Sequence, residues 1–405
     1  MSDSNKKTCN DAKQPILVLD LVRLVLERLS FVDFHRARCV SSVWYSASKS
    51  CIGGTNPTAP WIILFPNEHV KTNNDSCKLI DPRDHSSYTI RDLGFDMVRS
   101  RCLASSGSWF LMLDHKTDFH LLNLFTRERI PLPSLESIDG WQMKFVRTGD
   151  CGFEMSMYYK AHGLISYGKN SDLRISDAVL WVDEKNRDYF VVWFHHSTFA
   201  YHKKGGDNNS WKVFQPSKHQ GCINMVFKEG KFYVLNPARN ISVFDFSGGH
   251  SPVEYATPPS PNDDYYVRNL AVTLSGEVLI ISSNPKKCFV KLYKIDPKSS
   301  EWRLIKSIGD EALILDLGIT VAAKDGVMRN CIYFSHHELL RYKGVSLCND
   351  DKYGICVYHI KTKKKVQEFE HLTTSSPILF KDARWFFPLL VETSCSKPIP
   401  SFVFW

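Results

Sequence analysis

The sequence has 405 residues, a formal net charge of +8, 43% hydrophobic residues and 23% charged residues, which is typical of a globular protein of two or three domains. No apolar run approaches the roughly 18 residues of a membrane span, and the polar start lacks the apolar core of a secretory signal. We therefore expect no membrane partner and a location in the cytoplasm, the nucleus or both. The mild basic excess is no strong signal for nucleic acid.

The cysteines give no sign of a cofactor. Twelve of them are spread from Cys9 to Cys395, and no two have the CxxC spacing of a structural zinc site. Cysteines of a chain that is not secreted usually behave as small buried hydrophobic residues. We predict no metal and no other cofactor.

After residues 1–14, which we expect to be disordered, residues 15–52 have a helical pattern. Apolar residues recur at helical spacing between Asp20 and Leu29, which predicts an amphipathic helix with one apolar face, capped by Asp20. Ser30 opens a capping-box pattern for a second helix that runs to about Val40. A third short helix follows.

These helices are too short to be robust alone. Isolated helices of about ten residues are marginal in water, and a module of about 40 residues buries little surface. Ser41 or Ser42 can cap the third helix, which carries Val43 and Trp44. The module must therefore pack on the rest of the chain or be completed by another protein.

The stretch from Leu19 to Trp44 resembles an F-box. The matching positions are Asp20, Leu21, Leu26, Arg28, Leu29, Ser30, Asp33, Arg36, Arg38, Val40 and Trp44. The usual proline is replaced by Val18, and the usual cysteine by Ser41. The resemblance implies an interface with a Skp-family adaptor and, through it, a cullin. The residues expected at this interface are Leu17, Leu19, Asp20, Leu21, Leu26, Leu29, Ser30, Asp33, Arg36, Val40 and Trp44.

Residues 53–60 are expected to form a linker, and residues 61–405 consist of short strand-like runs bounded by turn residues. A loose unit of apolar strand, alternating strand and charged turn recurs at residues 109–133, 189–214, 231–247 and 277–305, and in the pair of segments 331–337 and 355–369. Such repetition predicts a β-propeller of about six or seven blades. The fold class is therefore a small three-helix F-box followed by an all-β propeller. We expect strands 61–65 and 402–405 to share one blade and so close the ring of the propeller.

The order of several segments, including GKFYVLNPARNISVFDFS and NCIYF, resembles a large plant family that joins an F-box to a kelch-like β-propeller. The resemblance covers nearly the whole chain. It implies a receptor that binds an unidentified protein substrate.

Catalytic motifs are missing from the sequence. HHELLR (336–341) has Arg341 where a zinc protease needs its second histidine, and there is no GxSxG, P-loop or GxGxxG. The densest basic cluster, KTKKK (361–365), is expected to be a solvated turn between two strands.

We therefore expect a non-catalytic substrate-recognition subunit of an SCF-type ubiquitin ligase. The alternative is an autonomous β-propeller, either a scaffold or an enzyme with its site in the channel, whose F-box is degenerate. Exposure of Leu29 and its neighbours distinguishes the two, because an adaptor cannot reach buried side chains.

Overall fold

The computed structural model describes residues 19–29, 31–38, 40–48, 50–51, 59–66, 75–138, 140, 143–150, 152–159, 163–170, 175, 177–183, 185–195, 198–205, 209–216, 221–246, 253–261, 267–284, 289–296, 299–324, 326–335, 355–369 and 380–388. The described residues fall into two compact units, one with the helices and one with all the strands. Three predicted features lie outside the described residues: the disordered N-terminus, most of the linker and the strand at 402–405. No helix within these ranges is long and apolar enough to cross a membrane.

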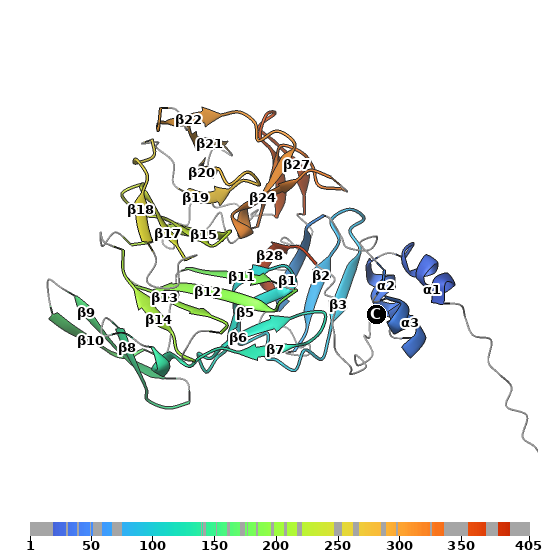
Figure 1. The fold of residues 1–405 in the computed structure, drawn as a ribbon, viewed down its shortest axis with the longest axis horizontal. Coiled ribbons are helices and arrows are strands. Elements are labelled where there is room, and N and C mark those ends of the chain that lie inside the picture. Colours follow the sequence, from blue (N-terminus) through green and yellow to red (C-terminus); the bar gives the residue numbers. More distant parts are fainter. Residues whose placement is uncertain are drawn as a thin grey trace, which may run out of the picture. The chain divides into compact units, whose positions relative to one another are not determined.

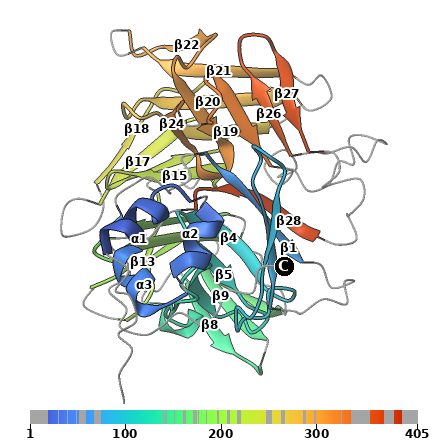
Figure 2. The same cartoon turned by 90° about the vertical axis from the view of Figure 1, so that its right-hand side faces the viewer.

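The helical unit contains α1 (Leu19–Leu26), α2 (Phe31–Arg38) and α3 (Ser42–Ser48), visible in Figure 2. The first helix ends at Leu26, three residues before the predicted end. Ser41 caps α3, because its hydroxyl oxygen accepts the backbone N–H of Trp44 at 3.4 Å. Arg23 of α1 donates to the carbonyl oxygen of Ser50 at 3.1 Å, which ties the first helix to the end of the third.

The described strands form six sheets. The sheet β28–β1–β2–β3 contains β1 (Trp61–Pro66), β2 (Cys77–Ile80), β3 (Ser87–Ile90) and β28 (Phe380–Phe386). The next contains β4 (Arg101–Ser106), β5 (Trp109–Leu113), β6 (Phe119–Asn123) and β7 (Arg129–Pro131). A three-stranded sheet contains β8 (Met143–Arg147), β9 (Phe153–Tyr159) and β10 (Gly163–Asn170).

Two further four-stranded sheets follow in chain order. One contains β11 (Asp177–Asp183), β12 (Asp188–His195), β13 (Thr198–Lys203) and β14 (Lys212–Phe214). The other contains β15 (Asn224–Lys228), β16 (Lys231–Leu235), β17 (Ile241–Asp245) and β18 (Val253–Ala256).

The last sheet has nine strands in the order β22–β21–β20–β19–β24–β23–β25–β26–β27. Its strands are β19 (Val267–Val272), β20 (Val278–Asn284), β21 (Phe289–Ile295), β22 (Trp302–Ile305), β23 (Glu311–Ile314), β24 (Ile319–Ala322), β25 (Cys331–Phe334), β26 (Cys356–His359) and β27 (Lys364–Glu368). A single parallel bridge, Val272 to Ile319, joins its two halves.

The sheets are arranged around a centre, as Figure 1 shows. Their first strands contact one another in the sequence β4, β11, β15 and β19, and β19 contacts β24. Because β4 contacts β11 directly, the sheet β8–β10 between them in the chain is not part of this inner ring. It is an insertion at the periphery.

The recurring units found in the sequence correspond to outer strands of successive sheets, three strands in most units and two (β16 and β17) in residues 231–247. Residues 109–133 contain β5–β7, and residues 189–214 contain β12–β14. The cluster KTKKK (361–365) spans the turn from β26 to β27, so the prediction of a turn between two strands is confirmed.

Closure joins the two ends of the propeller in one sheet. Strand β1 pairs antiparallel with β28, and Ile62 lies opposite Trp385. The strand that closes the ring beside β1 is therefore β28, and the predicted strand 402–405 lies outside the described residues. Trp385 secures β28, because its indole N–H donates to the carbonyl oxygen of Phe334 at 2.8 Å and its backbone N–H donates to Asp316 at 2.7 Å.

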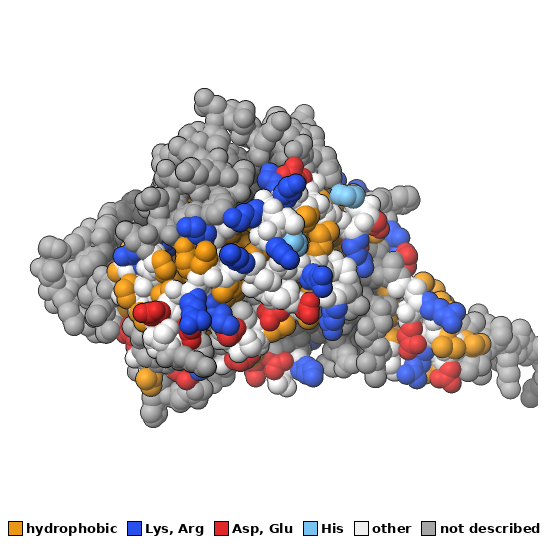
Figure 3. Space-filling model, turned by 90° about the horizontal axis from the view of Figure 1, so that it is seen from above, with side chains coloured by type: hydrophobic (Ala, Val, Ile, Leu, Met, Phe, Trp, Pro, Cys, Tyr) orange, Lys and Arg blue, Asp and Glu red, His pale blue; other side chains and the backbone are white. Residues whose placement is uncertain are grey.

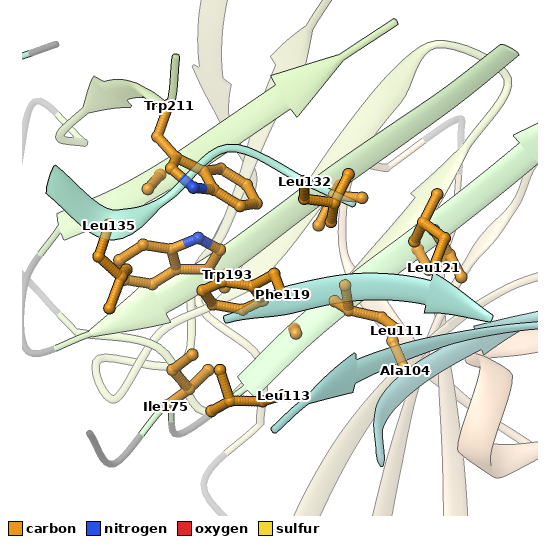
Figure 4. Close-up of a cluster of buried hydrophobic side chains, with 14 of the residues drawn as sticks. Ala104, Leu111, Leu113, Phe119, Leu121, Leu132, Leu135, Ile175, Trp193 and Trp211 are labelled. Atoms are coloured by element: carbon orange, nitrogen blue, oxygen red, sulfur yellow. The ribbon is translucent and has the colours of Figure 1, made fainter. Parts of the chain in front are cut away.

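The largest apolar cluster lies between the sheets β4–β7 and β11–β14 (Figure 4). The rings of Phe119 and Trp193 stack with centroids 5.7 Å apart, and Trp211 packs against both. The indole N–H of Trp211 donates to the carbonyl oxygen of Pro133 at 2.7 Å, so its one polar group is satisfied in the core.

Candidate functional site

Helix α1 has apolar residues on two sides. Val22 and Leu26 are fully buried. At 100° per residue, Leu24 lies opposite them, and Leu21 and Val25 lie on one flank. These three side chains are 57% (Leu21), 52% (Leu24) and 46% (Val25) exposed. The prediction of a single apolar face was wrong, because the helix keeps one apolar side for its core and presents a second to solvent.

The charged residues of α1 occupy the remaining flank. Asp20 and Arg23 form an exposed ion pair at 3.8 Å, and Glu27 follows one turn after Arg23. The exposed apolar side is therefore bordered by charge on one side only. We call Leu21, Leu24 and Val25 the outer face of α1.

The predicted adaptor-binding residues have different environments. Leu19, Asp20, Leu21, Asp33, Arg36 and Val40 are exposed, Leu29 and Trp44 are half-buried, and Leu26 is fully buried. Leu17 lies outside the described residues, and the structure does not describe Ser30. Leu26 is a core residue and is not accessible to a partner. Sequence reasoning missed Leu24, Val25 and Val43, which are all exposed.

Helix α2 is held on α3 by Arg38. Its guanidinium lies 5.7 Å from the ring centroid of Phe34 and 5.5 Å from that of Tyr45, both within cation–π range. Arg38 is buried, so this match to the F-box pattern has a structural role. Asp33 and Arg36 form an exposed ion pair at 3.2 Å on the opposite side of α2.

In the propeller, the centre of the ring contains a small polar pocket of about 50 Å³. Its lining includes Asp177, Asn224, Asp316 and Arg384. Arg384 donates to the carbonyl oxygens of Cys102 at 2.8 Å and Leu103 at 3.2 Å, and so connects β28 with β4. This volume has room for ordered water. The described residues contain no group of three His, Cys, Asp or Glu side chains placed to hold a metal ion.

Comparison with known proteins gives matches over both units. The family model described as the KIB1-4 beta-propeller matches residues 78–359, and the F-box domain model matches residues 15–54. The chain is 99% identical over 388 residues to "F-box protein KIB4" of Arabidopsis thaliana, which covers 96% of this chain and 99% of that protein.

More distant relatives match along the same length. Identity is 57% over 401 residues to "F-box/kelch-repeat protein KIB1" of Arabidopsis thaliana, with 96% of each chain covered. Among solved structures, a protein from Lactobacillus plantarum aligns with 81% of this chain and 99% of its own, at 9% identity and a TM-score of 0.36. That score is too low to carry an argument. The family matches confirm an F-box followed by a β-propeller.

Proposed function

Because the chain belongs to the plant family that joins an F-box domain to a KIB1-4 β-propeller, we propose that it is the substrate-recognition subunit of a cullin-based SCF-type ubiquitin ligase. Its F-box, placed at residues 15–52, docks on a Skp-family adaptor. The linker 53–60 joins it to the propeller, placed at residues 61–405, which binds the protein to be ubiquitinated. The chain acts in the cytoplasm, the nucleus or both.

The outer face of α1 is the observation that carries this proposal. A helix that already has a buried core side has no need of Leu21, Leu24 and Val25 on its exposed side. Covering each of them with a partner contributes about 1.5–3 kcal/mol to binding. Three such residues on adjacent turns are enough to anchor a helix-sized partner surface.

The propeller supplies position and performs no covalent step itself. Binding the target near the ligase raises the effective concentration of its lysines at the site of transfer. We assign six blades to the ring: β28 with β1–β3, then β4–β7, β11–β14, β15–β18, β19–β22, and β23–β27. The sheet β8–β10 is an insertion between the second and third blades.

Co-elution on a sizing column tests the adaptor interface. The full chain is mixed with a Skp-family adaptor, and the wild type is compared with the double variant Leu21→Asp, Leu24→Asp. We expect wild-type co-elution at micromolar concentration and its loss in the variant, with affinity reduced at least about 100-fold.

The control carries the same substitutions elsewhere. Leu274 and Leu304 are 49% and 51% exposed on the propeller, so Leu274→Asp, Leu304→Asp changes equally exposed leucines outside the F-box. This control must still co-elute. Wild type that is folded but never co-elutes, or an outer-face variant that binds as well as wild type, would overturn the proposal.

A further inference from the structure

One sector of the propeller carries more positive than negative charge. In the sequence, residues 319–335 and 355–370, which contain β24–β27, include six Lys and Arg residues and three carboxylates, Asp325, Glu368 and Glu370. The whole chain, by contrast, has 51 Lys and Arg against 43 Asp and Glu. Figure 3 views the propeller from the side of β22 and β27 and shows Lys and Arg side chains across it.

The basic residues gather at one end of this sector. Lys324 and Arg329 lie in the connection from β24 to β25, and Lys361 and Lys363 lie in the turn from β26 to β27. The backbone N–H of Ile360 donates to the carbonyl oxygen of Asn330 at 3.0 Å, which places the two connections side by side. Residues 361–366 are all exposed. We call Lys324, Arg329, Lys361, Lys363, Lys364 and Lys365 the basic end.

Nearby carboxylates neutralise only part of this charge. Lys365 pairs with Glu368 at 2.6 Å, and Arg329 lies 3.8 Å from Asp310, although both side chains of the second pair are almost fully in solvent. In the adjacent β2–β3 turn, Asp81 binds Arg83 at 2.6 Å, and Asp84 is exposed. No ion pair between described residues is found for Lys361 or Lys364.

Protection of a sheet edge explains only part of the pattern. β27 is an edge strand, and lysines on such strands discourage pairing with other chains. That accounts for Lys364 and Lys365. Lys324, Arg329, Lys361 and Lys363 lie in the connections beyond the strand ends, where there is no edge to protect.

We infer that the basic end is a docking surface for an acidic polypeptide segment, rich in Asp and Glu, of the protein that the propeller recruits. This inference rests on the proposed function for the identity of the partner, whereas its charge complementarity comes from the surface itself. Lysine ammonium groups on flexible stems suit carboxylates presented on an extended chain without a fixed geometry. The same field speeds the encounter with such a segment.

Fluorescence anisotropy with the full chain tests the inference. The probe is a short fluorescein-labelled peptide of alternating Glu and Gly, and its Gln counterpart is the neutral reference. The variant Lys361→Glu, Lys364→Glu is compared with Lys185→Glu, Lys203→Glu, which reverses two exposed lysines on another sheet with the same change in net charge. We expect about tenfold weaker binding in the first variant and wild-type binding in the second.

Each other result counts against the basic end. Equal weakening of peptide binding in both variants would show that binding follows the net charge of the protein. Equal binding of the Glu and Gln peptides at low salt would show that the basic end does not recognise carboxylates. A short DNA duplex bound more tightly than the peptide at equal salt would make the surface a nucleic-acid site instead. Adaptor co-elution is measured separately, so its failure would reject the proposed function while leaving this result to stand.

Discussion

Gly318 lies where the chain turns from the centre of the ring into β24. Its φ of 63° is in the left-handed region, and a Cβ placed there would overlap Cγ2 of Val226 and come within 3.1 Å of the carbonyl oxygen of Leu270. Both neighbours belong to strands that surround the centre. Glycine is therefore required at this position for two reasons: the backbone is left-handed, and there is no space for a Cβ atom.

Gly318→Ala is expected to lower the free energy of unfolding by about 2–4 kcal/mol, because the left-handed cost and the overlap add. Gly276→Ala is the matched control, since Gly276 has a φ of 81° but open space around its Cβ position. It should lose only about 1–2 kcal/mol. Urea unfolding followed by tryptophan fluorescence measures both, and equal losses would contradict the role of Val226 and Leu270.

His202 is a buried titratable residue between strands of one sheet. Its Nδ1 lies 3.2 Å from the carbonyl oxygen of Ser210, so Nδ1 carries the proton and Nε2 accepts from the hydroxyl of Tyr189 at 3.3 Å. Burial lowers the pKa of His202, although the bond to Ser210 opposes this shift. The folded protein therefore binds this proton less readily than the unfolded chain does.

Stability from His202 is complete above the unfolded pKa of about 6.5 and falls as the pH drops below that value. We expect the urea midpoint of the wild type to decrease more between about pH 7.5 and 5.5 than that of His202→Gln, which cannot titrate. Parallel decreases in the two proteins would show that other groups control the acid sensitivity.

At the residue scale, the sequence predicted most of the exposed F-box positions but assigned Leu26 to the wrong environment. Leu26 matches the family pattern as well as Leu21 does, and only the packing of α1 on α3 separates a buried leucine from an exposed one. Leu24 lies outside the apolar stripe that the helical spacing predicts, so the sequence pattern does not assign it to a contact face. The signal in the sequence was that apolar residues lie on both sides of a short helix, which indicates one side for the core and a second side for a partner.

Among the elements, the inserted sheet β8–β10 is attached partly through one arginine. Arg147 of β8 binds Glu136 and Asp118, each at 2.8 Å, and its guanidinium lies 4.5 Å from the ring centroid of Phe153. Glu136 belongs to the short helix Leu135–Ser137. These contacts connect the insertion to the preceding sheet, and Phe145 and Phe153 pack into the same core.

Arg147→Met is expected to remove about 1–2 kcal/mol of local stability, because two charge-assisted bonds are lost. Amide hydrogen exchange should accelerate in residues 143–159, while the inner strands keep their protection. Arg329→Met serves as the control, since Arg329 lies 3.8 Å from Asp310 and both side chains are largely exposed. Uniform acceleration across the propeller would show that the insertion is not a separate unit.

The sequence identified the outer strands of the sheets better than the inner ones. Strand β4, with the sequence RCLASS, has small and polar residues because it borders the polar centre of the ring. Such a strand lacks the apolar alternation that identifies β5 or β12. The sequence also could not predict that β8–β10 lies outside the ring. That position follows from the contact between β4 and β11, which are far apart in the chain.

Across the whole molecule, Trp385 is the residue on which ring closure depends most. Its side chain is fully buried, packs edge-on against Tyr333 with centroids 5.0 Å apart, and bonds to Phe334 of another sheet. Residues 402–405 are apolar and aromatic, whereas β28 includes the charged residues Lys381, Asp382 and Arg384, so composition did not identify the closing strand. The hydrogen bonds that hold β28 beside β1 join Trp385 to Phe334 and Asp316, which are distant in the sequence, so only the folded structure reveals them.

Trp385→Ala is expected to cost about 3–5 kcal/mol and to loosen the ring on both sides of the closure. Hydrogen exchange should accelerate in β1–β3 and in β25–β27 together, because β28 contacts both groups. Trp385→Phe should retain most of the packing and lose the bond to Phe334, giving an intermediate effect. Acceleration confined to β28 in the alanine variant would contradict a closure role.

Pairing of β1 with β28 also has a consequence for biosynthesis. All six residues of β1 are buried in the finished protein, yet its partner strand leaves the ribosome more than 300 residues later. At roughly 5–20 residues per second, this apolar strand waits about 15–60 s for its partner. The nascent chain is thus exposed to aggregation throughout that interval, and its yield in a cell should depend on chaperones that shield the first strand until the last is made.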